Sequence, residues 1–448
     1  MNKKNKDKKK LEDPTADMYN SEGLNSNSYF DINSFTDETC FAPKEIPFTE
    51  VVSMTPKMLP MSKRLEGFKV DKDGTLKVAC KEIKTKQKAA ITGIFKRAAV
   101  KLLEGKNVVG MSLPINIFQP RSTIERLGDL FSYFPHYCNL AAETDDEIKR
   151  IKYLTSAVVA SCQFQMNQWK PFNPIMGETY HCKYDEDTEL FLEHTSHHPA
   201  ISNFYLKGKK WTCYGAFLYN GKVRPNNVSL FSETWSTLKF EDGRELTFNW
   251  PWLKMGNFLI GKRKISMIKL VCVKSKDAKV KCIVKFNKEV KRKMMGLIKE
   301  TAYNVCHGSI YIYDPIKEQT MIKSKFYDTI SSLGKMVDVE QEIETVTGNW
   351  LENLCFDDVE YWNVKDYQNG KVHVPVENCL PSSYRFREDL IWLYYKCEKR
   401  AGIWKDILEN QQRKERKLRK EGKKIRDKEN GVVKKKKGFF SMFKSKPK

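Results

Sequence analysis

The sequence lacks most of the short patterns by which catalytic and metal sites are recognised. Its twelve cysteines are scattered, with no CxxC pair, which argues against a structural zinc site and a disulfide framework and favours a reducing compartment. No GxSxG or HExxH pattern occurs either, so neither a serine hydrolase nor a zinc peptidase is indicated. We therefore expect a protein that is not an enzyme and that uses no metal or cofactor.

Long apolar segments are absent as well. No stretch of eighteen apolar residues occurs, so we expect no membrane-spanning helix. The first ten residues, MNKKNKDKKK, are polar and contain no apolar core of a signal peptide. No internal repeat is visible. These absences predict a cytoplasmic protein.

Positive charge is abundant but unevenly distributed. The formal net charge of the 448 residues is +23; residues 413–448 contribute about +13 and the first ten residues about +5. Such an excess predicts an anionic partner, which is a nucleic acid, an acidic membrane surface or a phosphorylated small molecule. Because the charge lies mostly at the two ends and no nucleic-acid-binding motif is present, we do not expect nucleic acid.

The middle of the chain has the pattern of a large antiparallel sheet. From 178 to 328, about ten to thirteen short runs such as ETYHCKY, WTCYGAFLY and GSIYIY alternate apolar and polar residues between turn-forming residues. An antiparallel sheet of that many strands tends to curl or close, and a barrel this wide is not filled by its own side chains. We therefore expect an apolar cavity or tunnel inside a wide barrel.

Helical patterns flank this region. Within 89–103, apolar residues recur at helical spacing at Ile91, Ile94, Phe95 and Leu102. This pattern fits a surface helix, a helix lying on a membrane or a movable cover. We expect one helix to start near Ser122 and another to span 143–169, with Thr144 and Glu147 as its capping box. From about residue 340 we expect helices joined by loops, including a continuous helix over 387–424.

Histidines concentrate in one window. The segment EHTSHHPAIS, residues 193–202, places His197 and His198 side by side before Pro199. On a strand, successive side chains point to opposite faces, which disfavours a shared metal. Anion binding explains the pair better, because Pro199 bends the chain and a nearby phosphate would raise the pKa of both rings. Two structural histidines on a loop are the alternative.

Two further segments offer charged partners. QWKPFNPIMGE, residues 168–178, holds Lys170 directly before Pro171 and Asn173 between Pro171 and Pro174, and these prolines stiffen the loop. Lys405, Glu409 and Arg413 follow at intervals of four and therefore share one helix face. Taken alone, this stripe fits an ordinary solvated ladder of ion pairs.

Four segments together resemble the oxysterol-binding-protein-related family of lipid-transfer proteins, and they follow one another in the order that family has. In chain order, within residues 88–415, they are LPINIFQPRSTIERL, KPFNPIMGETY, EHTSHHPAIS and KDILENQQR. The histidine segment resembles that family's EQVSHHPP, with Ala200 in place of the second proline and His194 and Thr195 in place of Gln and Val. Because 87 residues precede the matching region, we expect no pleckstrin-homology domain before it.

The resemblance implies an α+β fold: a large near-closed antiparallel β-barrel with a central lipid tunnel, an N-terminal lid and flanking helices. It implies phosphatidylinositol 4-phosphate as one ligand and a sterol or phosphatidylserine as the other. The residues it assigns to the phosphoinositide headgroup are Lys170, Asn173, His197, His198, Lys405, Glu409 and Arg413. The helix with Ile91, Ile94, Phe95 and Leu102 would be the lid.

We accordingly divide the chain into a flexible region 1–85, a lipid-binding domain 86–415 and a basic helix and tail 416–448. The tail is expected to dock on anionic membranes through Lys434, Lys435, Lys436, Lys437, Phe439, Phe440 and Phe443, or else to be a disordered solubilising tail. YFDINSFTDET, residues 29–39, resembles the motif that recruits lipid-transfer proteins to the endoplasmic reticulum; a linker is the alternative.

The expected function is exchange of phosphatidylinositol 4-phosphate for a sterol or phosphatidylserine between membranes, one lipid at a time, by a peripherally membrane-associated protein. A sensor or scaffold that binds the same lipids without net transfer is the alternative, and the sequence does not separate the two.

Overall fold

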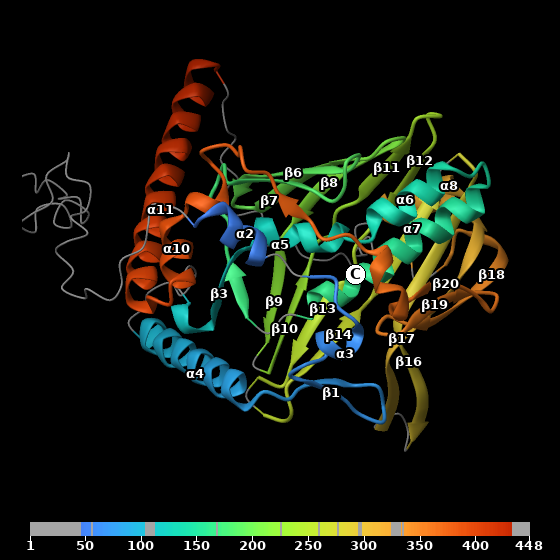
Figure 1. The fold of residues 1–448 in the computed structure, drawn as a ribbon, viewed down its shortest axis with the longest axis horizontal. Helices are drawn as coiled ribbons and strands as arrows, with labels where there is room; N and C mark the ends of the chain where they lie inside the picture. Colours follow the sequence, from blue (N-terminus) through green and yellow to red (C-terminus); the bar gives the residue numbers. More distant parts are fainter. Residues whose placement is uncertain are drawn as a thin grey trace, which may run out of the picture. The chain divides into compact units, whose positions relative to one another are not determined.

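Antiparallel strands form the largest part of the structure. The computed structural model describes residues 46–431 apart from 55–56, 104–112, 167–168, 225, 259, 276, 294–297, 324–332 and 334–335. Its larger sheet has thirteen strands in the order β20-β19-β18-β17-β16-β15-β12-β11-β8-β7-β6-β5-β21 (Figure 1). They are β5 Thr179–Lys183, β6 Glu189–His197, β7 Ala200–Lys207, β8 Trp211–Leu218, β11 Ser236–Phe240, β12 Glu245–Phe248, β15 Leu270–Ser275, β16 Val280–Lys293, β17 Ile298–Tyr313, β18 Val339–Asn349, β19 Asn353–Phe356, β20 Val359–Asn363 and β21 Val374–Pro375.

This large antiparallel sheet with covering helices confirms the expected α+β class. Pairing between strands close in sequence, as in β5 to β8, gives the predicted hairpin meander. Among the described strands, no pairing joins β20 to β21, so the curved sheet has two edges.

The strand region is longer than the sequence indicated. Helix with loops was expected from about 340, but β18, β19 and β20 occupy 339–363, so that prediction was wrong. The segment VEQEIETVTGN of β18 is rich in acidic residues, and only Val346 is fully buried in it. Its place in the sheet follows from pairing with β17 over nine residue pairs, which a local pattern does not reveal.

A second sheet contains residues that were expected to be flexible. Its order is β1-β2-β14-β13-β10-β9. The predicted flexible region 1–85 is wrong for its described part, because Leu76 in β2 pairs with Ile265 in β14 and Ile46 is fully buried. The strands are β1 Phe68–Val70, β2 Leu76–Val78, β9 Asn220–Arg224, β10 Asn227–Phe231, β13 Trp252–Gly256 and β14 Lys264–Ile268.

Helices cover the sheets, and two of them differ from the sequence-based expectation. A helix does start after Ser122, as α5 Thr123–Gly128. The helix expected over 143–169 is α7 Glu147–Ser161, capped by Asp146, whose carboxylate accepts from the N–H groups of Ile148 (2.9 Å) and Lys149 (3.2 Å). The capping box with Thr144 was therefore wrong, since an aspartate nearer the helix satisfies the free N–H groups.

The other helices are α2 Phe48–Met54, α3 Met61–Arg64, α4 Lys81–Leu103, α6 Phe134–Ala142, α8 Pro315–Lys323, α10 Glu388–Tyr394 and α11 Glu398–Glu429. The continuous helix expected over 387–424 is thus interrupted at 395–397, where Lys396 has a φ of 62°. The break changes the direction of the chain, and α11 packs beside α10 (Figure 1). No helix in the described part of the chain is both long and apolar enough to cross a membrane.

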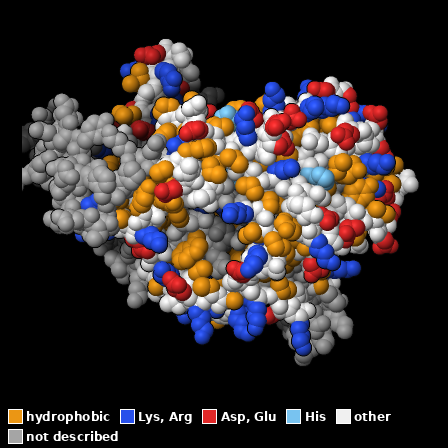
Figure 2. All heavy atoms as spheres, in the orientation of Figure 1, with side chains coloured by type: hydrophobic (Ala, Val, Ile, Leu, Met, Phe, Trp, Pro, Cys, Tyr) orange, Lys and Arg blue, Asp and Glu red, His pale blue; other side chains and the backbone are white. Residues whose placement is uncertain are grey.

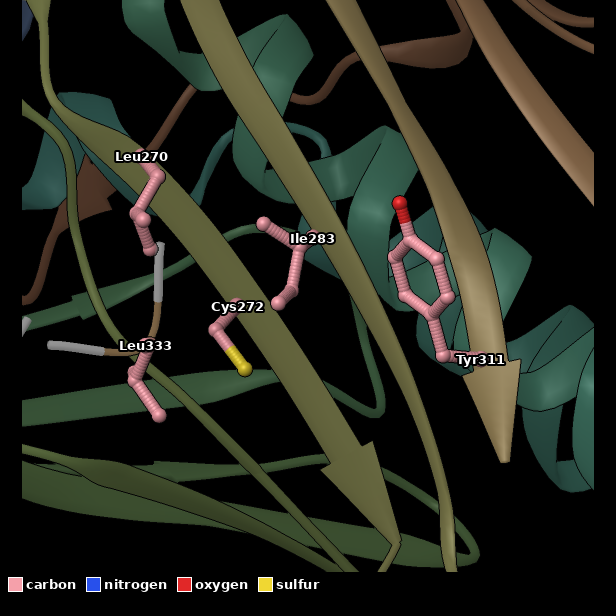
Figure 3. Close-up of a cluster of buried hydrophobic side chains, with 5 residues drawn as sticks. All are labelled: Leu270, Cys272, Ile283, Tyr311 and Leu333. Carbon is pink, nitrogen blue, oxygen red and sulfur yellow. The ribbon is translucent and has the colours of Figure 1, made fainter. Parts of the chain in front are cut away.

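The sheet interior is apolar on both faces near its centre. Strand β15 is buried at five of its six positions: α7 contacts it, and Leu270, Cys272, Ile283, Tyr311 and Leu333 form a cluster there (Figure 3). Ten described cysteines carry free thiols and Cys397 is disulfide-bonded. Across the described ranges, no group of three or more His, Cys, Asp or Glu side chains is placed to hold a metal ion.

Candidate functional site

A cavity of about 410 Å³, lined by charged and apolar side chains, lies where three distant segments meet. One segment follows β4 (Lys170–Phe172), the second is the turn between β6 and β7, and the third runs along α10 and α11. Six of the seven residues predicted for the headgroup line it: Asn173, His197, His198, Lys405, Glu409 and Arg413. The fold therefore brings together side chains more than two hundred residues apart.

The two histidines reach the cavity from a tight hairpin. His197 is the last residue of β6 and lies opposite Ala200, the first residue of β7. His198 and Pro199 form the turn, so the two rings are not held to the alternation of a strand. Their centroids are 4.9 Å apart in an edge-to-face arrangement, and both line the cavity.

His194 supports this pair from inside the sheet. It is fully buried; its Nδ1 is hydrogen-bonded to Ser202 Oγ (2.9 Å) and its Nε2 to His197 Nδ1 (3.1 Å). Burial, followed by His197 and Arg387, lowers the pKa of His194 to about 4. Burial and then the neighbouring His198 lower the pKa of His197 as well, so both rings are biased toward the neutral form when no anion is present.

Lys170 lies behind Asn173. Its Nζ donates to Asn173 Oδ1 (2.8 Å) and to the carbonyl of Pro171 (3.0 Å), 4.6 Å from the ring centroid of Phe118. The parallel pairing of β3 (Phe118–Ser122) with β4 sets Phe118 beside Lys170. Burial, and then the positive charge of Lys405, lower the pKa of Lys170 to about 7.

The stripe on α11 faces the cavity. Lys405 Nζ lies 2.7 Å from Glu409 Oε1, and Arg413 Nη2 donates to Glu409 Oε2 at 3.0 Å. Lys405 is buried, whereas Arg413 is half exposed. Glu409 thus holds two cations of one helix face at the cavity, which is more than a solvated ladder of ion pairs.

A family model described as "Oxysterol-binding protein" matches residues 98–443. The chain belongs to the oxysterol-binding protein family. Oxysterol-binding protein 9 of Dictyostelium discoideum is 29% identical over 340 residues, which cover 74% of this chain and 76% of that protein. Oxysterol-binding protein-related protein 3B of Arabidopsis thaliana is 24% identical over 327 residues, or 71% and 68% of the two chains.

Solved structures share the fold of this oxysterol-binding protein family member. The Osh3 ORD of Saccharomyces cerevisiae, crystallised in complex with PI(4)P, superposes with a TM-score of 0.53 at 20% identity and covers 72% of this chain and 84% of its own. The Osh1 ORD domain in complex with cholesterol gives 0.52 at 18% identity, covering 73% and 78%.

Sequence reasoning missed a buried ion network in the wall of the cavity, to which Arg387 and Asp389 belong. Arg387 donates to both carboxylate oxygens of Asp389 (3.1 and 2.7 Å), to Glu178 Oε2 (2.8 Å) and to the carbonyl of Asn173 (2.8 Å). It fixes the loop that carries Asn173 against the start of α10. Glu178, the acidic residue of MGETY, was visible in the sequence. No local pattern pairs it with Arg387, which lies 209 positions later.

Two more arginines of α11, Arg416 and Arg419, also line the cavity and were not predicted. Continuing the interval of four residues would have given Lys417, which does not line the cavity. Arg416 follows Arg413 by three residues, so the spacing alone does not find it. Because α11 is one helix to Glu429, the expected boundary between 415 and 416 falls inside an element of the site.

Other expected functional segments lie wholly or partly outside the described residues. The backbone of 81–103 is helical, as α4, but the side chains of Ile91, Ile94, Phe95 and Leu102 are outside the description. So are the segment 29–39 and the tail 432–448 with its lysines and phenylalanines. Their roles as lid, receptor motif and docking tail stay predictions.

Proposed function

We propose that this oxysterol-binding protein family member binds one lipid at a time in a hydrophobic tunnel and exchanges phosphatidylinositol 4-phosphate for a sterol, or for phosphatidylserine, between membranes. The observation that carries the proposal is the cavity lined by six of the seven residues named above. Cations of α11, the two imidazoles of the β6–β7 turn and the amide of Asn173 converge there on a space of headgroup size, which favours a phosphorylated ligand.

The charged residues and the two histidines have distinct roles in the proposed headgroup site. The phosphate monoester carries between one and two negative charges at neutral pH. Arg413 offers a planar fork of donors, and Lys170 and Lys405 offer ammonium groups. The anion would also raise the pKa of His197 and His198, so that each ring donates from both nitrogens. Glu409 orients Lys405 and Arg413 or accepts from an inositol hydroxyl.

The acyl chains supply most of the binding free energy in this proposal, at about 0.8 kcal/mol for each CH₂ group removed from water. They would lie inside the curved sheet, and α4 would close over them. The lipid is therefore recognised by its headgroup and retained by its chains.

The solved relatives support the choice of ligands. The Osh3 ORD is bound to PI(4)P, and Osh1 ORD domains are bound to cholesterol and to ergosterol. We infer that a sterol is the second ligand of this chain ahead of phosphatidylserine. We also infer a cytoplasmic protein bound peripherally to membranes, with 432–448 as a docking tail and 29–39 as a contact for a receptor of the endoplasmic reticulum.

The histidine pair tests the headgroup assignment. His197→Ala combined with His198→Ala should weaken phosphoinositide binding by about 3 kcal/mol, because two hydrogen bonds to a charged group are lost. Sterol binding should change little. Lipid extraction from vesicles of known composition measures both ligands, and an equal loss of both would show misfolding and reject the assignment.

An assay with donor and acceptor vesicles distinguishes lipid transfer from lipid sensing without net transfer. Exchange predicts that phosphoinositide moves from donor to acceptor vesicles when the second lipid is offered in the acceptor. Binding without net movement would favour the sensor or scaffold.

A further inference from the structure

An exposed aliphatic side chain stands at the tip of the β13–β14 hairpin. In Ile260, 78% of the residue surface is exposed, and the following Gly261 and Lys262 are exposed too. A single exposed isoleucine is ordinary on a protein surface. What distinguishes Ile260 is the rigid loop that carries it and the basic residues beside it.

The loop that carries Ile260 is braced by a second hairpin. Asn226, in the β9–β10 turn, donates from Nδ2 to the carbonyl of Ile260 (3.1 Å) and accepts from its N–H on Oδ1 (3.1 Å). The N–H of Phe258 donates to the carbonyl of Asn226 (3.2 Å), and Asn257 Nδ2 donates to the carbonyl of Lys262 (2.9 Å). Ile260 is thus presented on a preorganised loop, which reduces the ordering cost of binding.

Basic residues surround this tip. Arg224 at the end of β9 and Lys262 of the loop are exposed, and Lys264 follows at the start of β14. Lys222 of β9 is also exposed, but its Nζ lies over the rings of Phe231 (5.0 Å) and Trp252 (4.9 Å), away from the tip. Figure 2 shows Lys and Arg side chains along the lower edge of this view, over the first part of α4 and the neighbouring strand ends. Each such charge near an anionic bilayer strengthens binding about fivefold.

The tip is connected to α4. Arg263 is buried, its guanidinium lies 3.8 Å from the ring centroid of Phe258, and its Nη1 donates to Gln87 Oε1 in α4. Figure 1 shows the β13–β14 tip beside the N-terminal end of α4. A surface that binds the tip therefore also lies next to the start of that helix.

We propose that the described residues of the β13–β14 tip, 257–258 and 260–263, together with Arg224 and Asn226, form a membrane-docking surface: Ile260 enters the bilayer while Arg224 and Lys262 contact anionic headgroups. A bilayer matches both features at once, because it accepts an aliphatic side chain next to positive charges. A nucleic acid would use the charges and leave Ile260 in water. The surface shares no residue with the lining of the headgroup cavity.

The full chain is tested by flotation with phosphatidylcholine vesicles that contain or lack phosphatidylserine. Ile260→Asp should lower the partition coefficient about tenfold. The matched control is Ile316→Asp on α8, where the isoleucine is 77% exposed, and it should bind like the unaltered chain. Equal binding by all three proteins, or an equal loss in both variants, would overturn the proposal.

A second variant keeps the test independent of Ile260. Arg224→Glu with Lys262→Glu should lower binding about tenfold on phosphatidylserine vesicles, with no effect on pure phosphatidylcholine. Lys183→Glu with Lys239→Glu, at two half-exposed lysines of the large sheet, should have little effect. If removal of 432–448 alone abolishes vesicle binding, the tail and not this loop is the docking surface.

The same variants are assayed for capture of a water-soluble short-chain phosphoinositide without vesicles. Capture should be unchanged, because the loop lies outside the cavity. If even the unaltered chain fails to capture the lipid, the proposed exchange function falls while the docking surface is still decided by flotation. If Ile260→Asp loses capture as well as vesicle binding, the loop is structural and the docking proposal is rejected.

Discussion

Lys170 shows how one residue can link headgroup binding to pH. Its pKa is lowered to about 7, first by burial and then by Lys405, so near pH 8 it is mostly neutral in the empty site. A bound phosphate would raise this pKa again. Because the raised pKa belongs to the bound state, the extra affinity is fully present below pH 7 and is lost as the pH rises through the bound pKa.

We therefore expect phosphoinositide binding near pH 8 to take up close to one proton at Lys170. Calorimetry in buffers of different ionisation enthalpy measures this uptake. Lys170→Arg is the control, since arginine stays charged throughout and should bind without that proton. Unchanged uptake in this variant would contradict the assignment to Lys170.

Arg387 illustrates a residue whose role is to hold the site together. It is buried and bridges Asp389, Glu178 and the carbonyl of Asn173. Removing one partner of a buried ion network leaves unpaired charges, which costs about 3 kcal/mol or more. Glu178 accepts in turn from Ser122 Oγ and from the N–H of Ile175, so the effect would spread into the loop.

Arg387→Met should accordingly lower the free energy of unfolding by about 3 kcal/mol, as measured by urea denaturation. Both ligands should be bound less well in this variant, unlike in the histidine variant. A stable protein with a selective loss of phosphoinositide would show that Arg387 contacts the headgroup directly.

At the scale of elements, α11 is the main determinant of charge at the cavity. One face of this single helix carries five charged residues that line the cavity: Lys405, Glu409, Arg413, Arg416 and Arg419. An α-helix rises 1.5 Å per residue, so the charged face extends about 20 Å from the buried Lys405 outward. The part past Arg413, which looks like a solvated charge run in the sequence, belongs partly to the site.

Arg416→Ala with Arg419→Ala should weaken phosphoinositide binding by about 1 kcal/mol, since both arginines are exposed and contribute modestly. Lys417→Ala with Lys420→Ala removes the same charge from exposed positions of the helix that do not line the cavity, and should have less effect. Titration with the short-chain lipid compares the two, and equal losses would reduce the role of Arg416 and Arg419 to net charge.

At the scale of the whole molecule, the basic tail and the lipid-binding fold should act separately. Removing 414–448 would also remove Arg416 and Arg419, so a clean truncation begins at 432. A chain ending at 431 should capture soluble phosphoinositide as the full chain does, but bind anionic vesicles more weakly. Loss of soluble capture would show that the tail contributes to the cavity.

The sequence by itself determined the strand-rich middle of the chain, through local alternation, and the resemblance to the family, through four short motifs. The residues proposed for the headgroup followed from that resemblance; the helical spacing of four placed Lys405, Glu409 and Arg413 on one helix face without assigning them a ligand. The sequence also located the starts of individual elements such as α5. Its failures were β18 to β20, the capping of α7 and the break before α11, where pairing partners or single backbone angles decided the outcome.

Only the tertiary structure decided which side chains share one space. Burial and strand pairing placed His194 behind His197, Arg387 beneath Asn173, and Arg416 and Arg419 at the rim. These contacts join residues far apart in the chain, so their energies depend on geometry that no local pattern contains. The braced tip at Ile260 is likewise a product of two hairpins meeting, which neither hairpin indicates alone.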